Sequence, residues 1–497
     1  MAFDWSSATV GDFVDLQRGN TYQSALLDTP GPVLLGLASI ERDGGFRPDK
    51  LRTYGGESPA KLLVYPGDMY VSLKDVTQSG DLLGSVARVP NFITVGRMTQ
   101  DTVKLVFKNE PIDRSYLYWV LRTPEYREYC RARSMGTTNL SLSRDDFLSF
   151  PVPEPTSARL SIQRTLDAIE GKITLNRDIN QTLEAMAQAI FKSWFVDFDP
   201  VKAKIAAKQT LTPALSQRER QEIVLRAAMS AISGAGQGRP NAAGAGCAGA
   251  AKPAAELDTL PPEQYAQLAV TAALFPDEME VSELGQIPKG WIHQTLAQLT
   301  DKIGSGATPR GGKEVYLDDG VALIRSQNVY DSLFVWEGLA RISDEAATQL
   351  KGVTVQEDDV LLNITGASIL RTCVVEPDVL PARVNQHVAV IRAKAGVPPR
   401  FIHMHLLRPD IKSYWLGLNA GASREAITKA HIESLTLLTP SPELLATFQT
   451  ATDPLFRQMQ GFARQMRVLG ELRDTLLPKL LSGELSVEAL TEAAGAA

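Results

Sequence analysis

Two long stretches of the chain carry apolar residues at spacings that alternate between four and three. The first runs from Ile162 to Trp194 and the second from Phe448 to Leu480. This period of about 3.5 residues, kept over several heptads, is typical of coiled coils. Each stretch is more than twice as long as an average helix of about 11–12 residues. We therefore expect two long helices that pack against each other in antiparallel orientation, with Asn176 and Asn180 on the seam weakening it but fixing its register. The alternative is that each helix lies as an amphipathic helix on the core of its own domain.

The two stretches belong to a repeat in which the second half of the chain resembles the first. GTTNLSLSRDDFLSFPVPEP aligns without a gap with GASREAITKAHIESLTLLTP, and LEAMAQAIFKSWF aligns with LGELRDTLLPKLL. The aligned positions lie about 286 residues apart and include Gly136 with Gly421, Leu183 with Leu469, Arg97 with Arg383 and Gln100 with Gln386. Solenoid repeats have periods of roughly 20–50 residues. The long period therefore indicates a duplicated domain and two similar surfaces related by a pseudo-twofold axis.

Changes in pattern divide the chain into segments. Short β-branched runs bounded by Gly, Pro and Asp, such as KLLVYPGDMYVSLKD and DDVLLNITG, predict strands in two globular domains, residues 1–155 and 282–441. The long helices are expected at 156–204, which includes the segment after the first helix, and at 442–484, followed by a frayed tail at 485–497. Between the repeats, residues 205–281 contain the stretch GAGQGRPNAAGAGCAGAAKPAA. Its composition predicts a flexible insertion and connector without a packed core.

Composition is that of an ordinary globular protein, with 44% hydrophobic and 22% charged residues. The sequence contains no run of about 18 apolar residues and no signal-peptide pattern at MAFDWSSATV, so we expect a cytoplasmic protein without a membrane partner. Its three cysteines have no CxxC spacing. We therefore expect neither a disulfide framework nor a metal site.

Motifs that would indicate catalysis are missing. GSGATPRGGKE resembles a phosphate-binding loop, but Ala307 occupies the place of the first glycine and Glu314 that of Ser/Thr. The Asn-Pro-Pro-Tyr and Asp-Pro-Pro-Tyr sequences of amino-methyltransferases do not occur, and no G-x-S-x-G elbow marks a nucleophile. His403 and His405 are two residues apart and would not share a helix face. We therefore assign no catalytic residue and expect no cofactor on this chain.

Several segments resemble the specificity subunits of type I restriction-modification enzymes. They are TLNRDINQTLEAMAQAIFKSWFVDFDPVKAK, SELGQIPKGW, LRDTLLPKLLSGEL, VSLKDVTQSGDLLG, LIRSQNV, NITGASI and NQHVAVIRA. The resemblance covers nearly the whole chain except about 205–260. It implies an α+β fold with two tandem α/β target recognition domains, related by pseudo-twofold symmetry and separated by a long antiparallel two-helix coiled coil that acts as a ruler.

The resemblance also implies a non-catalytic subunit that reads a bipartite target in double-stranded DNA and docks two methylation subunits and restriction subunits. S-adenosylmethionine, ATP and Mg²⁺ are then expected on those partner subunits. One alternative is an enzyme, a single-chain methyltransferase-nuclease, which is disfavoured because no methyltransferase core is found. Another is a coiled-coil adaptor whose domains bind protein. The net charge of −6 keeps the adaptor open, because any DNA contact must then come from a local face.

Base readout uses side chains with paired donors and acceptors, such as Arg for guanine and Asn or Gln for adenine. Such side chains lie at predicted strand ends and loops in both domains. The candidate DNA-binding residues are Arg18, Asn20, Tyr22, Ser72, Lys74, Thr77 and Gln78 in the first domain, and Thr308, Arg310, Arg325, Gln327, Asn328, Asn363, Thr365 and Ser368 in the second. For each of them, the alternative is a solvated polar loop or a turn cap.

Overall fold

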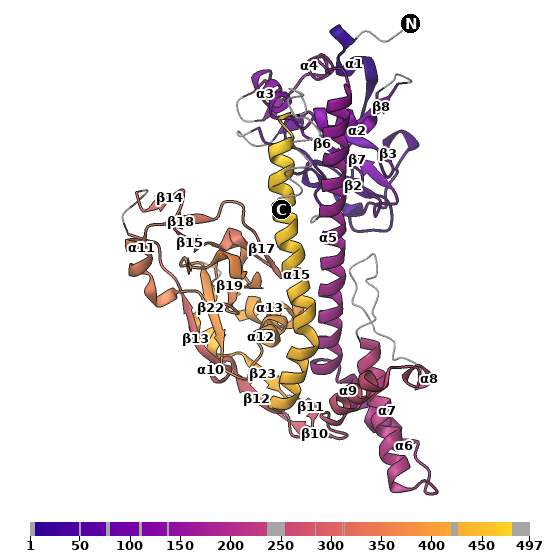
Figure 1. Cartoon of the computed structure of the whole chain (residues 1–497), viewed down its shortest axis with the longest axis vertical. Coiled ribbons are helices and arrows are strands. Elements are labelled where there is room, and N and C mark those ends of the chain that lie inside the picture. Colours follow the sequence, from indigo (N-terminus) through magenta and orange to yellow (C-terminus); the bar gives the residue numbers. More distant parts are fainter. Residues whose placement is uncertain are drawn as a thin grey trace. The chain divides into compact units, whose positions relative to one another are not determined.

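The computed structural model describes residues 5–48, 51–75, 80–108, 112–136, 139–235, 254–283, 285–310, 312, 314–418 and 426–479. The chain divides into two compact units, Met1–Arg177 with Arg464–Ala497, and Asp178–Ala463. Two long helices, α5 (Ser157–Phe195) and α15 (Pro442–Leu476), each contribute one part to the first unit and one part to the second (Figure 1). Among the described residues, no helix is both long enough and apolar enough to cross a membrane.

The first unit is built around a four-stranded antiparallel sheet, with a smaller mixed sheet and a strand pair beside it. The main sheet has the order β1 (Val14–Arg18), β8 (Thr102–Phe107), β4 (Met69–Ser72) and β6 (Val86–Arg88). The mixed sheet and the pair contain β2 (Val33–Leu35), β7 (Gly96–Met98) and β3 (Leu63–Val64), and β5 (Lys74–Asp75) with β9 (Leu140–Ser141). The short helices are α1 (Val10–Phe13), α2 (Arg114–Val120), α3 (Pro124–Ala132) and α4 (Arg144–Leu148).

The second unit repeats this plan. Its main sheet has the order β13 (Thr300–Ser305), β22 (Val388–Ala393), β19 (Val360–Asn363) and β20 (Thr372–Val374). Its mixed sheet has the order β14 (Tyr316–Leu317), β18 (Ala340–Ile342), β15 (Val321–Ile324) and β21 (Ala382–Val384). Strand pairs are β10 (Met279–Ser282) with β11 (Gly285–Pro288), β12 (Ile292–Thr295) with β23 (Thr436–Thr439), and β16 (Val329–Tyr330) with β17 (Leu333–Phe334). The short helices are α10 (Leu296–Leu299), α11 (Asp344–Gln349), α12 (Pro399–Leu407), α13 (Pro409–Leu418) and α14 (Lys429–Ser434).

The matching topology confirms the duplication. The strand order β1-β8-β4-β6 corresponds to β13-β22-β19-β20, and the parallel pair β2 and β7 corresponds to β15 and β21. Helices α1 and α10 also begin alike. The backbone N–H of Thr9 donates to the side chain of Asp12 at 2.7 Å, and that of Thr295 donates to the side chain of Gln298 at 2.8 Å. This arrangement satisfies backbone donors at a helix start. The mixed helix-and-sheet fold and the two strand-rich domains agree with the sequence prediction.

Within each unit α5 and α15 pack in antiparallel orientation, as the heptad spacing predicts. Asn176 Nδ2 donates to Gln465 Oε1 in the first unit, and Asn180 Nδ2 donates to the carbonyl of Met459 in the second, both at 3.1 Å. The predicted seam residues that are buried are Ile162, Leu166, Ile169, Asn176, Leu183, Ala187, Trp194, Phe448, Thr452 and Leu476. The first helix ends at Phe195, one residue after the last predicted seam position, Trp194. Phe198 adopts a left-handed φ of 56°, which interrupts the helix after Phe195.

The seam asparagine at position 176 gives a stability prediction. Asn176 is fully buried, and its Oδ1 accepts no hydrogen bond. Burying an unpaired polar atom costs free energy, whereas leucine would fill a seam position with apolar surface. We expect Asn176→Leu to raise the free energy of unfolding by about 1–2 kcal/mol, seen as a higher urea midpoint of the full chain. Asn176→Ala, which removes the amide without filling the space, should not raise it. An equal or lower midpoint for the leucine variant would contradict the prediction.

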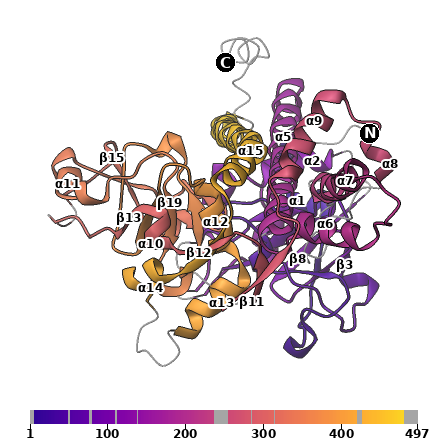
Figure 2. The ribbon, with the colours of Figure 1, turned by 90° about the horizontal axis from the view of Figure 1, so that it is seen from below.

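The segment between the repeats is a packed helical layer, which corrects the sequence prediction. It contains α6 (Asp199–Gln209), α7 (Gln217–Ala235), α8 (Ala254–Leu257) and α9 (Pro262–Ala273), with α6 and α9 against α7 (Figures 1 and 2). Ala228, Met229 and Ile232 of α7 are buried in one core with Val201 and Phe275. The expectation of a flexible insertion over 205–281 is therefore wrong for residues 205–235 and 254–281. The low-complexity residues 236–253 lie outside the described part of the chain.

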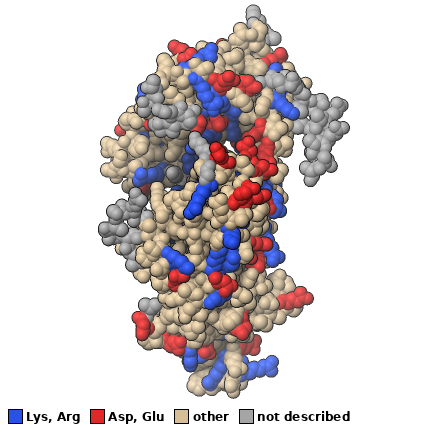
Figure 3. All heavy atoms as spheres, turned by 90° about the vertical axis from the view of Figure 1, so that its left-hand side faces the viewer, with Lys and Arg blue, Asp and Glu red and all other residues tan. Residues whose placement is uncertain are grey.

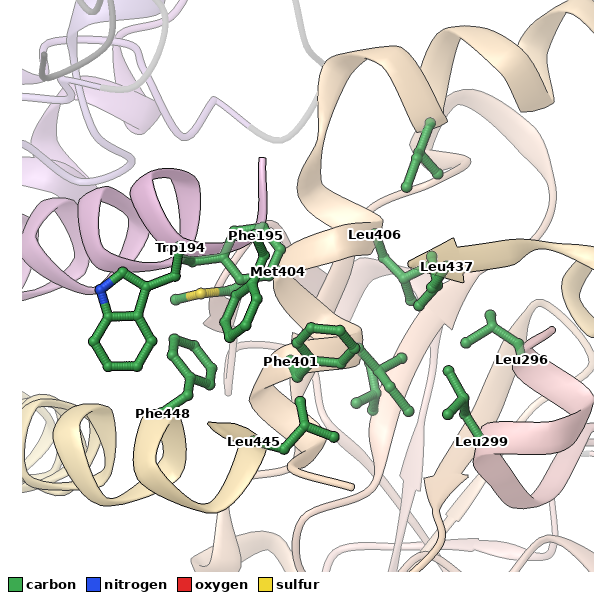
Figure 4. Close-up of a cluster of buried hydrophobic side chains, with 14 of the residues drawn as sticks. Trp194, Phe195, Leu296, Leu299, Phe401, Met404, Leu406, Leu437, Leu445 and Phe448 are labelled. Atoms are coloured by element: carbon green, nitrogen blue, oxygen red, sulfur yellow. The ribbon is translucent and has the colours of Figure 1, made fainter. Parts of the chain in front are cut away.

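Aromatic side chains at the end of α5 anchor the core of the second unit. Trp194 and Phe195 lie against Phe448 of α15, with ring centroids 6.1 and 5.0 Å apart. Phe401 and Met404 of α12 complete this cluster (Figure 4). The family-like sequence FKSWF thus serves packing, because Phe191, Trp194 and Phe195 are all buried in this core.

Candidate functional site

Three loops meet beside one end of the main sheet in the second unit. They follow β13 (306–310), follow β19 (364–368) and connect β21 to β22 (385–387). The backbone N–H of Gly306 donates to the carbonyl of Asn385 at 3.1 Å, and that of Ile364 donates to the carbonyl of His387 at 3.0 Å. These bonds hold the three loops together independently of their polar side chains.

Four of those side chains form a continuous hydrogen-bonded chain, which we call the Thr308–Thr365 relay. Thr308 Oγ1 donates to Gln386 Oε1 at 2.8 Å, Gln386 Nε2 lies 3.0 Å from His387 Nε2, and His387 Nδ1 lies 2.6 Å from Thr365 Oγ1. An amide nitrogen can only donate. His387 Nε2 therefore accepts, and Nδ1 carries the proton that is donated to Thr365. The relay brings together the predicted residues Thr308 and Thr365 through two residues that the sequence analysis did not select.

Gly306 lets the loop after β13 pass close to the backbone of Val384, at the end of β21. A Cβ atom on Gly306 would lie 1.7 Å from the carbonyl oxygen of Val384, and one on Gly19 would lie 1.9 Å from that of Thr99. Both distances are far below contact, so a side chain would displace backbone at either position. The close approach is thus a feature of both units.

The first unit holds an equivalent set of positions. Val103 pairs with the last residue of β1 and with Val71 of β4, as Ala389 pairs with the last residue of β13 and with Leu362 of β19. Counting from these pairs, Gln100 and Gln386 are equivalent, as are Asp101 with His387 and Lys74 with Thr365. Lys74 Nζ lies 3.7 Å from Asp101 Oδ1. An ion pair between exposed Lys74 and partly buried Asp101 thus takes the place of the Thr365–His387 hydrogen bond.

Buried cation–π contacts support the loop after β1. Arg97 is 3% exposed, and its guanidinium lies 4.7 Å from the ring centre of Tyr54. Arg97 Nη2 donates to the carbonyl of Thr21 at 2.9 Å, and the ring of Tyr22 packs edge-on against Tyr54. The loop that carries Asn20 and Tyr22 therefore rests on an ordered base, while both of these side chains are exposed.

The structure places the other predicted residues in three groups. Arg18, Asn20, Tyr22 and Lys74 are exposed in the first unit, as are Thr308 and Arg310 in the second. By contrast, the buried side chains are Ser72, Asn328 and Asn363. Asn363 Nδ2 donates to the carbonyl of Ser326 at 2.8 Å and Asn328 Nδ2 to that of Val335 at 2.9 Å. These two buried amides therefore bind the backbone of neighbouring loops and are not available to a ligand. Thr77 and Gln78 lie outside the described residues.

Two of the remaining candidates, Arg325 and Gln327, contact a second loop. Arg325 Nη2 and Gln327 Nε2 both donate to the carbonyl of Gly338, at 2.5 and 3.1 Å. They tie residues 335–338 to the end of β15, which leaves part of each side chain facing solvent. Ser368 ends the short 3₁₀ turn Gly366–Ser368 that follows Thr365.

Neither charge nor reactive groups indicate catalysis at these loops. Lys and Arg interleave with Asp and Glu over the face drawn in Figure 3 (Figure 3). Within the described ranges, no group of three His, Cys, Asp or Glu side chains could hold a metal ion. Burial raises the pKa of the thiols of Cys130 and Cys373, which disfavours the nucleophilic thiolate. The loops instead present amides, hydroxyls and a few cations, which is chemistry for binding.

Sequence comparisons point to one kind of protein. The chain is 31% identical over 392 residues to the type I restriction enzyme HindI specificity subunit of Haemophilus influenzae, covering 74% of this chain and 77% of that protein. It is 22% identical to the MjaIX specificity subunit of Methanocaldococcus jannaschii, covering 98% and 95%. No protein-family model matches the chain.

Solved structures of similar proteins include the S subunit of a type I restriction-modification system from M. genitalium. It is 13% identical, covers 96% of each chain and gives a TM-score of 0.49. The HsdS subunit from Thermoanaerobacter tengcongensis, also 13% identical with 96% of each chain covered, gives a TM-score of 0.27.

Proposed function

The chain belongs to the family of type I restriction enzyme specificity subunits, and we propose that each of its two strand-rich domains reads one half of a bipartite target in double-stranded DNA. The observation that carries this proposal is the equivalent loop cluster in both units. Each cluster presents an exposed glutamine, Gln100 or Gln386. Beside it lies a loop whose glycine packs directly against the neighbouring backbone. Two similar but not identical reading surfaces suit a target made of two different half-sequences.

In this proposal two methylation subunits dock on the chain and restriction subunits join them. The chain carries a net charge of −6, so much of the phosphate contact is assigned to those partners, leaving base readout to the loops. S-adenosylmethionine, ATP and Mg²⁺ likewise belong on the partner subunits. The purified chain should then bind DNA weakly and transfer no methyl group, and methyl transfer by this polypeptide alone would contradict the proposal.

A domain exchange tests whether each domain reads its own half of the target. The core of the first unit includes Ile162, Leu166 and Ile169 of α5 together with Leu476 and Leu477 beside the end of α15. A donor domain from another family member should therefore bring residues equivalent to about 8–169 and to these two leucines. We expect the reconstituted methylation complex to recognise a new sequence in one half of the target and to keep the other half.

The exchange is measured by sequencing the methylated sites of treated DNA. The reciprocal exchange in the second unit is its control and should alter the opposite half. Simultaneous change of both halves would contradict two separate readers. Association with methylation subunits without any sequence preference in the wild-type complex would instead favour a protein-binding adaptor.

A further inference from the structure

We propose that Gln386 reads an adenine in the half-site of the second unit and that His387 and Thr365 hold its amide in the reading orientation. This inference rests on the proposed function and adds a specificity-determining residue to it. Gln386 is exposed, while its neighbours His387 and Thr365 are partly buried.

The relay provides one hydrogen-bond partner for each polar atom of the Gln386 amide. Oε1 accepts from Thr308 Oγ1 at 2.8 Å, and Nε2 donates to His387 Nε2 at 3.0 Å. An amide has two donor hydrogens and two acceptor lone pairs. One N–H and one lone pair of Gln386 therefore remain for a ligand on an exposed side chain.

This free donor and acceptor match one base edge. In the major groove adenine presents N7 as an acceptor and N6 as a donor, which glutamine contacts with both amide atoms. Guanine presents two acceptors at the same places, so the amide oxygen would face another oxygen. The fixed order of donor and acceptor thus selects adenine, and only while the amide cannot turn over.

His387 and Thr365 prevent that turn. Thr365 lies two residues after the end of β19, and its Oγ1 accepts the proton of His387 Nδ1 at 2.6 Å. The bond holds the imidazole ring in place, and the ring presents Nε2, the nitrogen that accepts, to the amide nitrogen at 3.0 Å. Thr365 therefore acts on the base only through two other side chains, so it is a positioning residue.

The first unit offers a matched comparison. At the place of His387 it has Asp101, which pairs with Lys74 at 3.7 Å across the loop. Gln100 occupies the position in the first unit that Gln386 occupies in the second, and it is exposed too. Gln100→Ala should therefore affect the other half of the target and serves as a control for Gln386→Ala.

The test uses the full chain assembled with its methylation subunits and a library of targets in which every position of both halves is varied. Gln386→Ala should lower the preference for adenine at one position of one half by about tenfold and spare the other half. Gln386→Glu, which replaces the donor by an acceptor, should abolish the adenine preference and favour cytosine there, since carboxylates accept from cytosine N4.

Two threonine variants separate positioning from folding. Thr365→Ser keeps the hydroxyl and should keep the preference, whereas Thr365→Val keeps the shape, loses the hydroxyl and should relax the same position that Gln386→Ala relaxes. Thermal midpoints of all variants show whether the domain remains folded. An unchanged base preference for folded Gln386→Ala overturns the inference, while a wild-type complex without preference in either half overturns the proposed function itself.

Discussion

Replacing Met229 with aspartate should lower the free energy of unfolding of the full chain by about 4 kcal/mol or more. Met229 of α7 is fully buried, next to Ala228 and Ile232. The substitution deletes most of a packed side chain, which alone costs about 2–5 kcal/mol in protein cores. It also leaves a carboxyl group without a partner in apolar surroundings. Such a loss is a large share of the roughly 5–15 kcal/mol that stabilises a folded domain.

The same substitution at Ile223 provides the control, because Ile223 lies on the same helix but is 38% exposed. Ile223→Asp should change the free energy of unfolding by about 0.5 kcal/mol at most. Urea denaturation of the full chain, followed by circular dichroism, measures both variants. Equal midpoints for Met229→Asp and the wild type would show that the helical layer contributes no core, as its sequence first suggested.

Acidification should destabilise the second unit strongly. His403 and His405 of α12 are each 1% exposed. Burial lowers the pKa of both imidazoles to about 3, with Arg400 and Lys412 acting in the same direction on His403 and Arg408 on His405. Asp410 acts in the opposite direction on His405. The His405 ring is packed edge-on against Phe191 and Phe401, at centroid distances of 4.8 and 4.6 Å.

The pKa shift fixes the direction of the effect. An unfolded histidine takes up a proton below its ordinary pKa of about 6.5, whereas these two stay neutral in the folded unit until the pH approaches 3. Their contribution to stability is therefore full above pH 6.5 and is lost as the pH falls toward 3. At pH 5 the loss is about 2 kcal/mol for each histidine, or about 4 kcal/mol together.

The measurement is the urea midpoint of the full chain at pH 7 and at pH 5. His405→Phe keeps an aromatic ring in the cluster but cannot take up a proton, so it should remove about half of the difference between the two pH values. A wild-type midpoint that is the same at both pH values would contradict the prediction.

Features with a local signature were predictable from the sequence. The heptad period of α5 and α15 depends only on neighbouring turns of one helix, and ten of its predicted seam residues are buried, including Ile162, Trp194 and Phe448. The last predicted seam position, Trp194, lies one residue before the end of α5, and the left-handed backbone of Phe198 separates this helix from α6. The helical layer, by contrast, was missed. Ala228 and Ser230 of α7 are buried but weakly apolar, so the Gly- and Ala-rich composition hides the helical period.

The loop cluster could be predicted only in part. Polar residues at strand ends were found, but their direction was not, because β19 is buried along its whole length and shows no alternation that would orient Asn363. Thr308 and Gln386 are 78 residues apart in the chain, and Thr365 and His387 are 22 apart. A linear pattern does not show such pairs. The alignment of Gln100 with Gln386 was the one available signal, and it carried no geometry by itself.

The first unit is built from two segments that lie far apart in the chain, and this affects how it can fold during translation. Leu476 and Leu477 share a buried cluster with Ile162 and Leu166, although the whole second unit, Asp178–Ala463, separates them along the chain. A ribosome that adds about 5–20 residues per second needs about 15–60 s to translate that intervening segment. Throughout this interval the apolar face of α5 has emerged without the helix that covers it. The nascent first domain is thus finished only after the second has been translated, which reverses the usual N-terminal-first order of maturation.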